Sequence, residues 1–183
     1  MSGIGRRGGA GGDIIAKSIK EDIIDRGDGY TATFAQGISQ DVGLVIGMEV
    51  FPISPAPQRN VLFDFFVYSE VMSEIRMNEN VTFTGTTLPI NLFNQNRNST
   101  NEATQVIVNR RDDGVVGYGT YLIPSTPAGD ARGLFVPAQM AGTQVVKNMI
   151  LKHNVNYFFF VYNRHTAAGT SRVGFKMDFY EFD

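Results

Sequence analysis

From residue 30 onward the chain carries short segments that are either apolar runs or alternate between apolar and polar residues, and these predict a series of β-strands. The pattern is clearest near the C-terminus, where Phe175, Met177 and Phe179 alternate with more polar positions, as on a strand with one face in water. Turn-forming Gly, Pro, Asp and Asn residues separate the apolar runs. The expected strands lie within 30–36, 42–51, 60–71, 81–93, 103–110, 117–124, 133–139, 156–163 and 171–182.

Many short strands without intervening helices predict an all-β fold. We expect a jelly-roll-like antiparallel β-sandwich over residues 27–183, preceded by an extended or partly helical N-terminal arm over residues 1–26. Residues 51–59 carry three prolines and are expected to form a loop, because proline cannot donate to the ladder of a central strand.

The first 26 residues follow a different pattern. Half of the first twelve positions are glycine, which costs too much backbone entropy for this segment to fold alone. Residues 13–25 then carry isoleucines at roughly helical spacing, with Asp13 as a candidate cap and Gly27 as a candidate end. Because isoleucine is β-branched, an extended arm also fits. In either form the apolar stripe needs a surface to lie on.

We expect that surface to belong to a protein partner, with the alternative that the arm folds back on its own domain. Nucleic acid is the weaker interpretation, since the arm has no aromatic side chain for base stacking and the whole chain has a net charge of -2. Arg6 and Arg7 would pair with acidic groups of the partner. The apolar contacts would come from Ile4, Ile14, Ile15, Ile19, Ile23 and Ile24.

Composition excludes several classes of site. The chain of 183 residues has no cysteine, so disulfides, cysteine-based zinc sites and cysteine nucleophiles are ruled out. It also lacks an apolar run of about 18 residues, so no membrane span is expected. We expect no cofactor.

Isolated polar residues give weak signals for catalysis. His153 and His165 flank one expected strand and should lie too far apart to share a metal. Asp112 and Asp113 stand beside two arginines and read as a turn rather than a calcium site. The Arg-Gly-Asp triplet that begins at Arg26 reads as a linker. With no recognisable nucleophile, phosphate-loop or zinc-protease motif, the sequence predicts a protein that is not an enzyme.

Three stretches carry a family resemblance. They are "INLFNQNRNST" (90–100), "TQVIVNRRDDGVVGYGT" (104–120) and "LKHNVNYFFFVYNRHTAAGTSRVGFKMDFYEFD" (151–183). Their succession of polar turn, Thr/Val-rich strand, Gly-rich segment and aromatic-acidic last strand resembles the capsid decoration or cement proteins of tailed phages. The likeness covers roughly residues 60–183. Residues 1–50 add nothing to it.

The resemblance implies a virion protein without catalysis, located on the capsid surface. Its partners would be the major capsid protein, gripped by the arm, and other copies of itself, as a homotrimer or a dimer. On this reading the asparagines of 94–98 form a hydrogen-bonded turn from which Arg97 reaches a neighbouring subunit. Deleting residues 1–24 should leave a folded domain that no longer binds capsids.

Two other functions stay open. A tail, collar or fibre-attachment protein of a phage would use the same fold at a lower copy number. A carbohydrate-binding β-sandwich would expose an aromatic platform, for which Tyr118, Tyr121 and Phe135 are candidates. The sequence leaves open the oligomeric state, the strand order and the helicity of residues 13–25.

Overall fold

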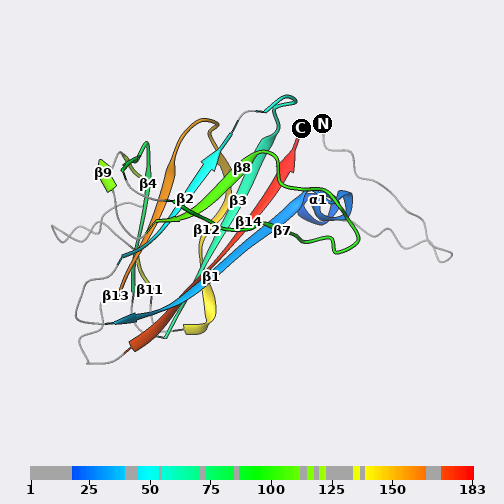
Figure 1. Ribbon diagram of the computed structural model, residues 1–183. Helices are drawn as coiled ribbons and strands as arrows, with labels where there is room; N and C mark the ends of the chain where they lie inside the picture. The colour runs from blue at the N-terminus through cyan, green and yellow to red at the C-terminus, as the bar shows by residue number, and fades with distance from the viewer. Residues whose placement is uncertain are drawn as a thin grey trace.

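The computed structural model is a sandwich of two antiparallel sheets, with helix α1 (Ile19–Arg26) packed at one end (Figure 1). It describes residues 18–39, 45–53, 55–70, 73–84, 87–111, 115–117, 120–122, 134–136, 139–163 and 170–183. The predicted all-β, jelly-roll-like sandwich is confirmed.

The strands differ greatly in length, and the long ones form the two layers. In chain order they are β1 (Gly29–Ser39), β2 (Val45–Pro52), β3 (Asn60–Ser69), β4 (Ser73–Glu79), β5 (Thr82–Phe83), β6 (Leu88–Pro89), β7 (Phe93–Asn94), β8 (Val106–Arg111), β9 (Val115–Gly117), β10 (Thr120–Tyr121), β11 (Leu134–Val136), β12 (Gln139–Leu151), β13 (Tyr157–Asn163) and β14 (Thr170–Phe182).

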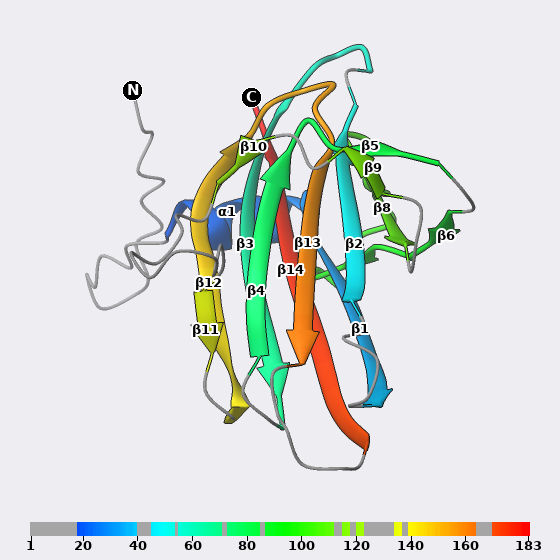
Figure 2. The ribbon, with the colours of Figure 1, turned by 90° about the vertical axis from the view of Figure 1, so that its left-hand side faces the viewer.

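Strand pairing is nested along the chain: β1 pairs with β14, β2 with β13, β3 with β12, and β4 with β10 and β11. One sheet has the order β12-β3-β14-β1-β7 and the other β10-β4-β13-β2-β8-β6. Figure 2 shows β4, β13 and β2 in the layer nearer the viewer, with β3, β14 and β1 behind them. A long hairpin wrapped into two sheets in this way is the jelly roll. We name the sheet that contains β14 the α1-side sheet and the other the opposite sheet.

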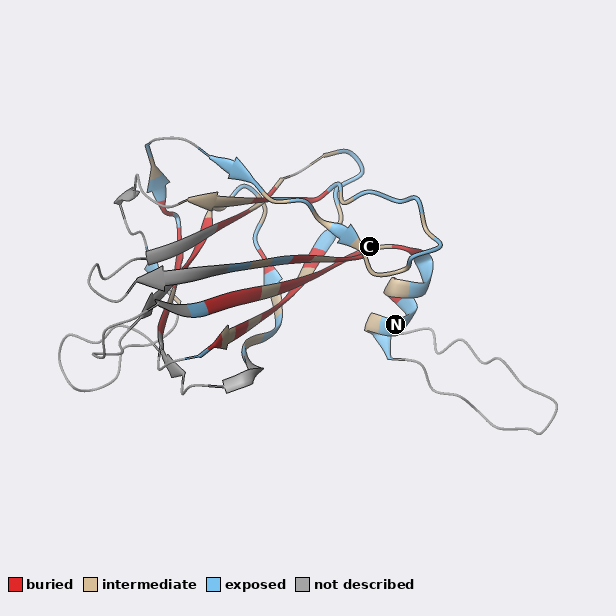
Figure 3. Ribbon diagram, turned by 60° about the horizontal axis from the view of Figure 1, so that its bottom comes forward, coloured by how far each residue is buried: buried red, intermediate tan, exposed pale blue. Residues whose placement is uncertain are grey.

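Aromatic side chains from the two sheets meet between the layers and form the core. The Phe159 ring of β13 lies 4.6 Å from the Phe65 ring and 5.3 Å from the Phe63 ring of β3, and within the α1-side sheet Phe63 lies 5.2 Å from Phe179 of β14. All four are buried, and burial of each contributes about 1.5–3 kcal/mol. In Figure 3 the buried positions run along these central strands. The alternation of Phe175, Met177 and Phe179 in the sequence therefore identifies the inner face of β14 correctly.

Each sheet also carries a cover on its outer face. On the opposite sheet, Phe158 and Phe160 point away from the main core and pack with Val81 and Phe83 in a second, smaller apolar cluster. Phe83 lies on β5, which pairs with β9, and its ring lies 4.9 Å from that of Phe158. On the α1-side sheet the cover is α1.

Three expectations about strands were wrong. Residues 81–93 do not form one strand, since β5, β6 and β7 pair with β9, β8 and β1 respectively. Strand β4 lies between the expected ranges 60–71 and 81–93 and was missed. Strand β12, the longest together with β14, had not been expected at all. Its pairing with β3 is interrupted by three register shifts, and Asn148 has a positive φ of 56°. These bulges break the alternation of apolar and polar positions from which a strand is recognised.

Candidate functional site

Helix α1 begins and ends at residues that fix its length. The Ser18 hydroxyl accepts a hydrogen bond from the backbone N–H of Glu21, and the Glu21 carboxylate accepts one from the backbone N–H of Ser18, which makes a capping box. Gly27 ends the helix in the left-handed conformation with a φ of 85°. The end at Gly27 is as expected, whereas the cap is Ser18 rather than Asp13.

One face of α1 is buried against the α1-side sheet. Ile23 is 1% exposed, and Ile24 packs on Gly29, where an added Cβ would lie 2.7 Å from the Ile24 side chain. Lys20 forms an ion pair with Asp64 of β3 and lies over the ring of Tyr180 of β14. The helix thus crosses the outer face from the start of β1 towards β3. Burial raises the pKa of Tyr180 to about 12.

The Lys20 contact compensates an acidic pair. Asp64 and Asp178 stand opposite each other on β3 and β14, and both are buried. The Lys176 amine donates to Asp178 at 2.7 Å, and the backbone N–H of Asn148 donates to Asp64 at 2.8 Å. Two neighbouring buried carboxylates stay charged only where cations or donors compensate each of them. Lys20 therefore links α1 electrostatically to the sheet.

The asparagine-rich loop holds the end of α1. The Asn94 side chain donates to the Gly27 carbonyl at 2.7 Å, and the Asn96 side chain donates to the Asp25 carbonyl at 2.9 Å. Asn101 reaches the Arg26 carbonyl at 3.3 Å. These bonds satisfy carbonyls that a helix leaves without partners at its C-terminus. Most of the asparagines thus serve the protein's own helix, while Arg97 is exposed in the turn.

A charged network closes this end of the sandwich. Glu181, with a side chain 1% exposed, accepts hydrogen bonds from the Thr104 N–H, the Thr104 hydroxyl and the Gln105 N–H at 2.9 to 3.0 Å. The Arg59 guanidinium lies 3.8 Å from Glu181 and donates to Asp28 at 2.8 Å. The Arg59 hydrogen bond holds the pKa of Asp28 below its usual value. We call this region, with α1 and loop 94–105, the closed end.

Two large apolar side chains stay exposed beside α1. Ile19 is 68% exposed, and Ile150 of β12 is 59% exposed. Lys20 follows Ile19 in the sequence, and Asn148 lies two positions before Ile150. Both Lys20 and Asn148 contact Asp64, so the two isoleucines lie near one point of the α1-side sheet. The same point is where the chain enters the described structure at Ser18. We call Ile19 and Ile150 the root patch.

The predicted contact residues separate into four groups. Ile19 and Arg97 are exposed, Ile24 is partly buried, and Ile4, Arg6, Arg7, Ile14 and Ile15 lie outside the described residues. Ile23 was expected to contact a partner, and this was wrong, because the domain itself buries its side chain. Residues 19–26, whose helicity the sequence leaves open, therefore form a helix docked on the sandwich, and they are not part of an arm that reaches a partner.

The other candidates contribute little. Tyr118, Asp112, Asp113 and His165, and the side chains of Tyr121 and Phe135, lie outside what the structure describes. Nδ1 of His153 lies 2.7 Å from the Ile53 carbonyl, which gives it a structural contact. Within the described ranges, no three His, Asp or Glu side chains gather as a metal site would require. In the same ranges, no helix has the length and apolarity to cross a bilayer.

Sequence reasoning missed the residues that fix the root of the arm. The Ser18-x-x-Glu21 spacing is a capping-box signal and would have placed the start of α1. No comparable signal marks Lys20 with Asp64, or Arg59 with Glu181, because those pairs join distant parts of the chain.

The chain matches no protein-family model and no curated protein.

Proposed function

We propose that this chain is a structural protein of a virus particle that decorates the outside of the assembled shell and stabilises it. The observation that carries the proposal is the fixed root of the arm. Helix α1 is capped, docked and paired through Lys20, so the segment before Ser18 starts from a defined place on the sandwich. The exposed root patch lies at the same place and extends the apolar character of the arm onto the domain.

A fixed root favours binding by the segment that precedes it. Ile4, Ile14 and Ile15 each add about 1.5–3 kcal/mol if buried on the shell, and ordering the glycine-rich stretch offsets part of that gain. Arg6 and Arg7 add ion pairs with acidic groups of the major capsid protein. Because such a protein binds the assembled shell and not its free subunits, binding shifts the equilibrium towards assembly. Many copies, as trimers or dimers, add avidity.

The fold agrees with this proposal by analogy. Jelly rolls form viral capsid domains, and they also form lectins and cupins, so the fold does not by itself assign a function. The arm and the root patch supply the specific argument.

The test is co-sedimentation of the purified protein with particles that lack it. Full-length protein should sediment in a fixed ratio to the major shell protein. A variant without residues 1–17 should keep its thermal midpoint and lose most of its binding. Deletion of residues 1–24, the first choice from sequence, would be a poor test, because it removes Lys20 and Ile23 and so disturbs the domain.

Point variants separate the root patch from general stickiness. The double variant Ile19→Lys with Ile150→Lys should weaken sedimentation with particles, because it places charge on the proposed contact. Ile107→Lys is the matched control, since Ile107 is 43% exposed but lies on β8 of the opposite sheet. Equal sedimentation of all three proteins, or full binding without residues 1–17, would remove this mechanism.

Copy number decides the position on the particle. Quantitative mass spectrometry of purified particles that contain the chain should give a fixed fraction of the shell copies for a decoration protein. A few copies per particle would instead place it in the tail, the collar or a fibre attachment, and absence from particles would reject a virion function.

A further inference from the structure

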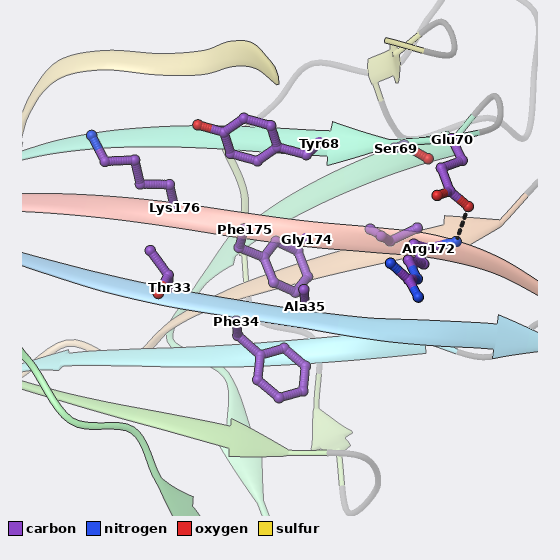
Figure 4. Close-up of a pocket in the computed structure, with 11 residues that line it drawn as sticks. Thr33, Phe34, Ala35, Tyr68, Ser69, Glu70, Arg172, Gly174, Phe175 and Lys176 are labelled. Carbon is purple, nitrogen blue, oxygen red and sulfur yellow. Dashed lines mark hydrogen bonds between the residues drawn. The ribbon is translucent and has the colours of Figure 1, made fainter. Parts of the chain in front are cut away.

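A shallow groove crosses the α1-side sheet at the end away from α1. It has a volume of about 470 Å³ and is lined by residues of β1, β3 and β14 (Figure 4). This volume falls within the range of small-molecule sites, about 300–1,000 Å³. We call this region the groove end. The groove meets the contacts that hold α1 only at Lys176, whose amine pairs with Asp178 opposite Asp64.

The floor of the groove lies over a glycine, which has no side chain to fill it. Gly174 of β14 is buried and stands in register between Ala35 of β1 and Tyr68 of β3. A Cβ at Gly174 would lie 3.3 Å from the Phe34 carbonyl oxygen and 3.4 Å from the Ala35 Cβ. With Gly174 and Ala35 side by side, the sheet surface is low at this row, and the aromatic ring of Tyr68 rises at its edge.

Polar groups stand at both ends of this hollow. Arg172 and Lys176 lie two positions before and after Gly174 and so face the same side of β14. The Lys176 amine is held 2.7 Å from Asp178. The Glu70 carboxylate accepts from the backbone N–H of Arg172 at 2.9 Å, which leaves the guanidinium without an acidic partner among the described residues. In Figure 4 the Tyr68 ring lies along β3 with its hydroxyl towards the Lys176 end.

This combination suits one chemical class. A partly exposed aromatic ring offers a flat apolar surface to a ligand that is itself flat and partly apolar. A guanidinium is the preferred bidentate partner of a carboxylate. The Glu70 carboxylate and the exposed Thr33 hydroxyl provide acceptors for hydroxyl groups. A pyranose ring that carries a carboxylate presents all three complementary features within one residue.

We propose that the groove end binds an acidic saccharide, with Tyr68 as the stacking platform and Arg172 as the partner of the sugar carboxylate. Lys176 lines the far end, but its amine is paired with Asp178, so Arg172 is the cation that recognises the carboxylate. The site is distinct from the aromatic platform expected from sequence. It stands independently of the proposed virion function, because it lies at the other end of the sheet from the root patch.

The experiment is an NMR titration of the uniformly ¹⁵N-labelled full chain with glucuronate, glucose and acetate in turn. Glucuronate should shift amides of β1, β3 and β14 around Gly174, with a Kd on the order of 1 mM for a single sugar unit. Glucose and acetate should each bind at least about tenfold more weakly, because each lacks one half of the recognition. The proposal would be overturned if glucose or acetate bound as tightly as glucuronate. It would also be overturned if glucuronate shifted no amide signal.

Variants at exposed positions keep the test independent of folding. Arg172→Gln and Ala35→Glu should each weaken glucuronate binding at least about tenfold while the thermal midpoint stays unchanged. Arg97→Gln is the matched control, an exposed arginine at the closed end, and should bind glucuronate like the parent protein. Tyr68→Ala should weaken glucuronate and glucose alike. Unaltered glucuronate binding in both Arg172→Gln and Ala35→Glu would also overturn the proposal.

Discussion

Glu181 and Glu70 both accept hydrogen bonds from backbone N–H groups, but they stand at opposite ends of the α1-side sheet. Glu181 is buried and satisfies two backbone N–H groups and a hydroxyl, with Arg59 beside it. Glu70 is exposed and accepts the backbone N–H of its cross-strand neighbour Arg172. At the closed end the carboxylate is buried in hydrogen bonds within the fold, whereas at the groove end the carboxylate is exposed to solvent. The difference separates the charges that hold the fold from those that can recognise a ligand.

The strongest test of this comparison removes the two glutamate side chains in turn. Glu181→Ala should lower the free energy of unfolding by about 3–5 kcal/mol, because Thr104 and Gln105 lose the acceptor of three hydrogen bonds and the buried Gln105 N–H is left without a partner. Glu70→Ala should change it by less than about 1 kcal/mol. Urea denaturation followed by circular dichroism measures both. Equal losses in the free energy of unfolding would mean that the carboxylates at the two ends contribute alike to stability.

A second contrast lies within α1. Ile23→Ala should cost about 2–4 kcal/mol, since it removes a side chain that is 1% exposed and leaves a cavity under the helix. Ile19→Ala, four positions earlier and 68% exposed, should stay within about 0.5 kcal/mol. Hydrogen exchange of the α1 amides adds a local readout and should accelerate in Ile23→Ala alone. Fast exchange of these amides in the parent protein would show that α1 is not docked.

The smallest expected effect is a dependence of stability on pH at the closed end. The pKa of Asp28 is lower in the folded protein than its ordinary value of 3.8, chiefly because Arg59 donates a hydrogen bond to it. The unfolded chain therefore binds this proton more readily. The resulting stabilisation is complete well above pH 4 and is lost as the pH falls through the folded-state pKa.

The variant Asp28→Asn isolates this contribution. Below about pH 3 it should lose less stability on further acidification than the parent protein, and at neutral pH it should be less stable. Asp183→Asn is the matched control, because Asp183 also pairs with Arg59 but its side chain is 85% exposed. Parallel pH profiles for the parent protein and Asp28→Asn, measured by urea midpoints, would contradict the assignment.

Local patterns in the sequence predicted what local physics controls. The period of two located the inner face of β14 that carries Phe175, Met177 and Phe179, and Gly27 marked the end of α1. The bulged strand β12 was missed because its irregular register hides the alternation. The polar networks were missed because Arg59 and Glu181 become neighbours only through the strand pairing. The groove depends on Gly174 facing Ala35, a match of register that no single segment encodes.

The nested pairing of the strands has a consequence for the order of events during synthesis. β14 lies between β3 and β1 and pairs with both, with Tyr30 opposite Phe179. A growing chain therefore exposes two unsatisfied strand edges and most of its phenylalanine side chains until residues 170–182 have left the ribosome. Contacts so distant in sequence form slowly, and open edges invite association between chains. We expect this domain to complete its folding only once residues 170–182 are available, and to depend in the cell on factors that shield unpaired β-edges until then.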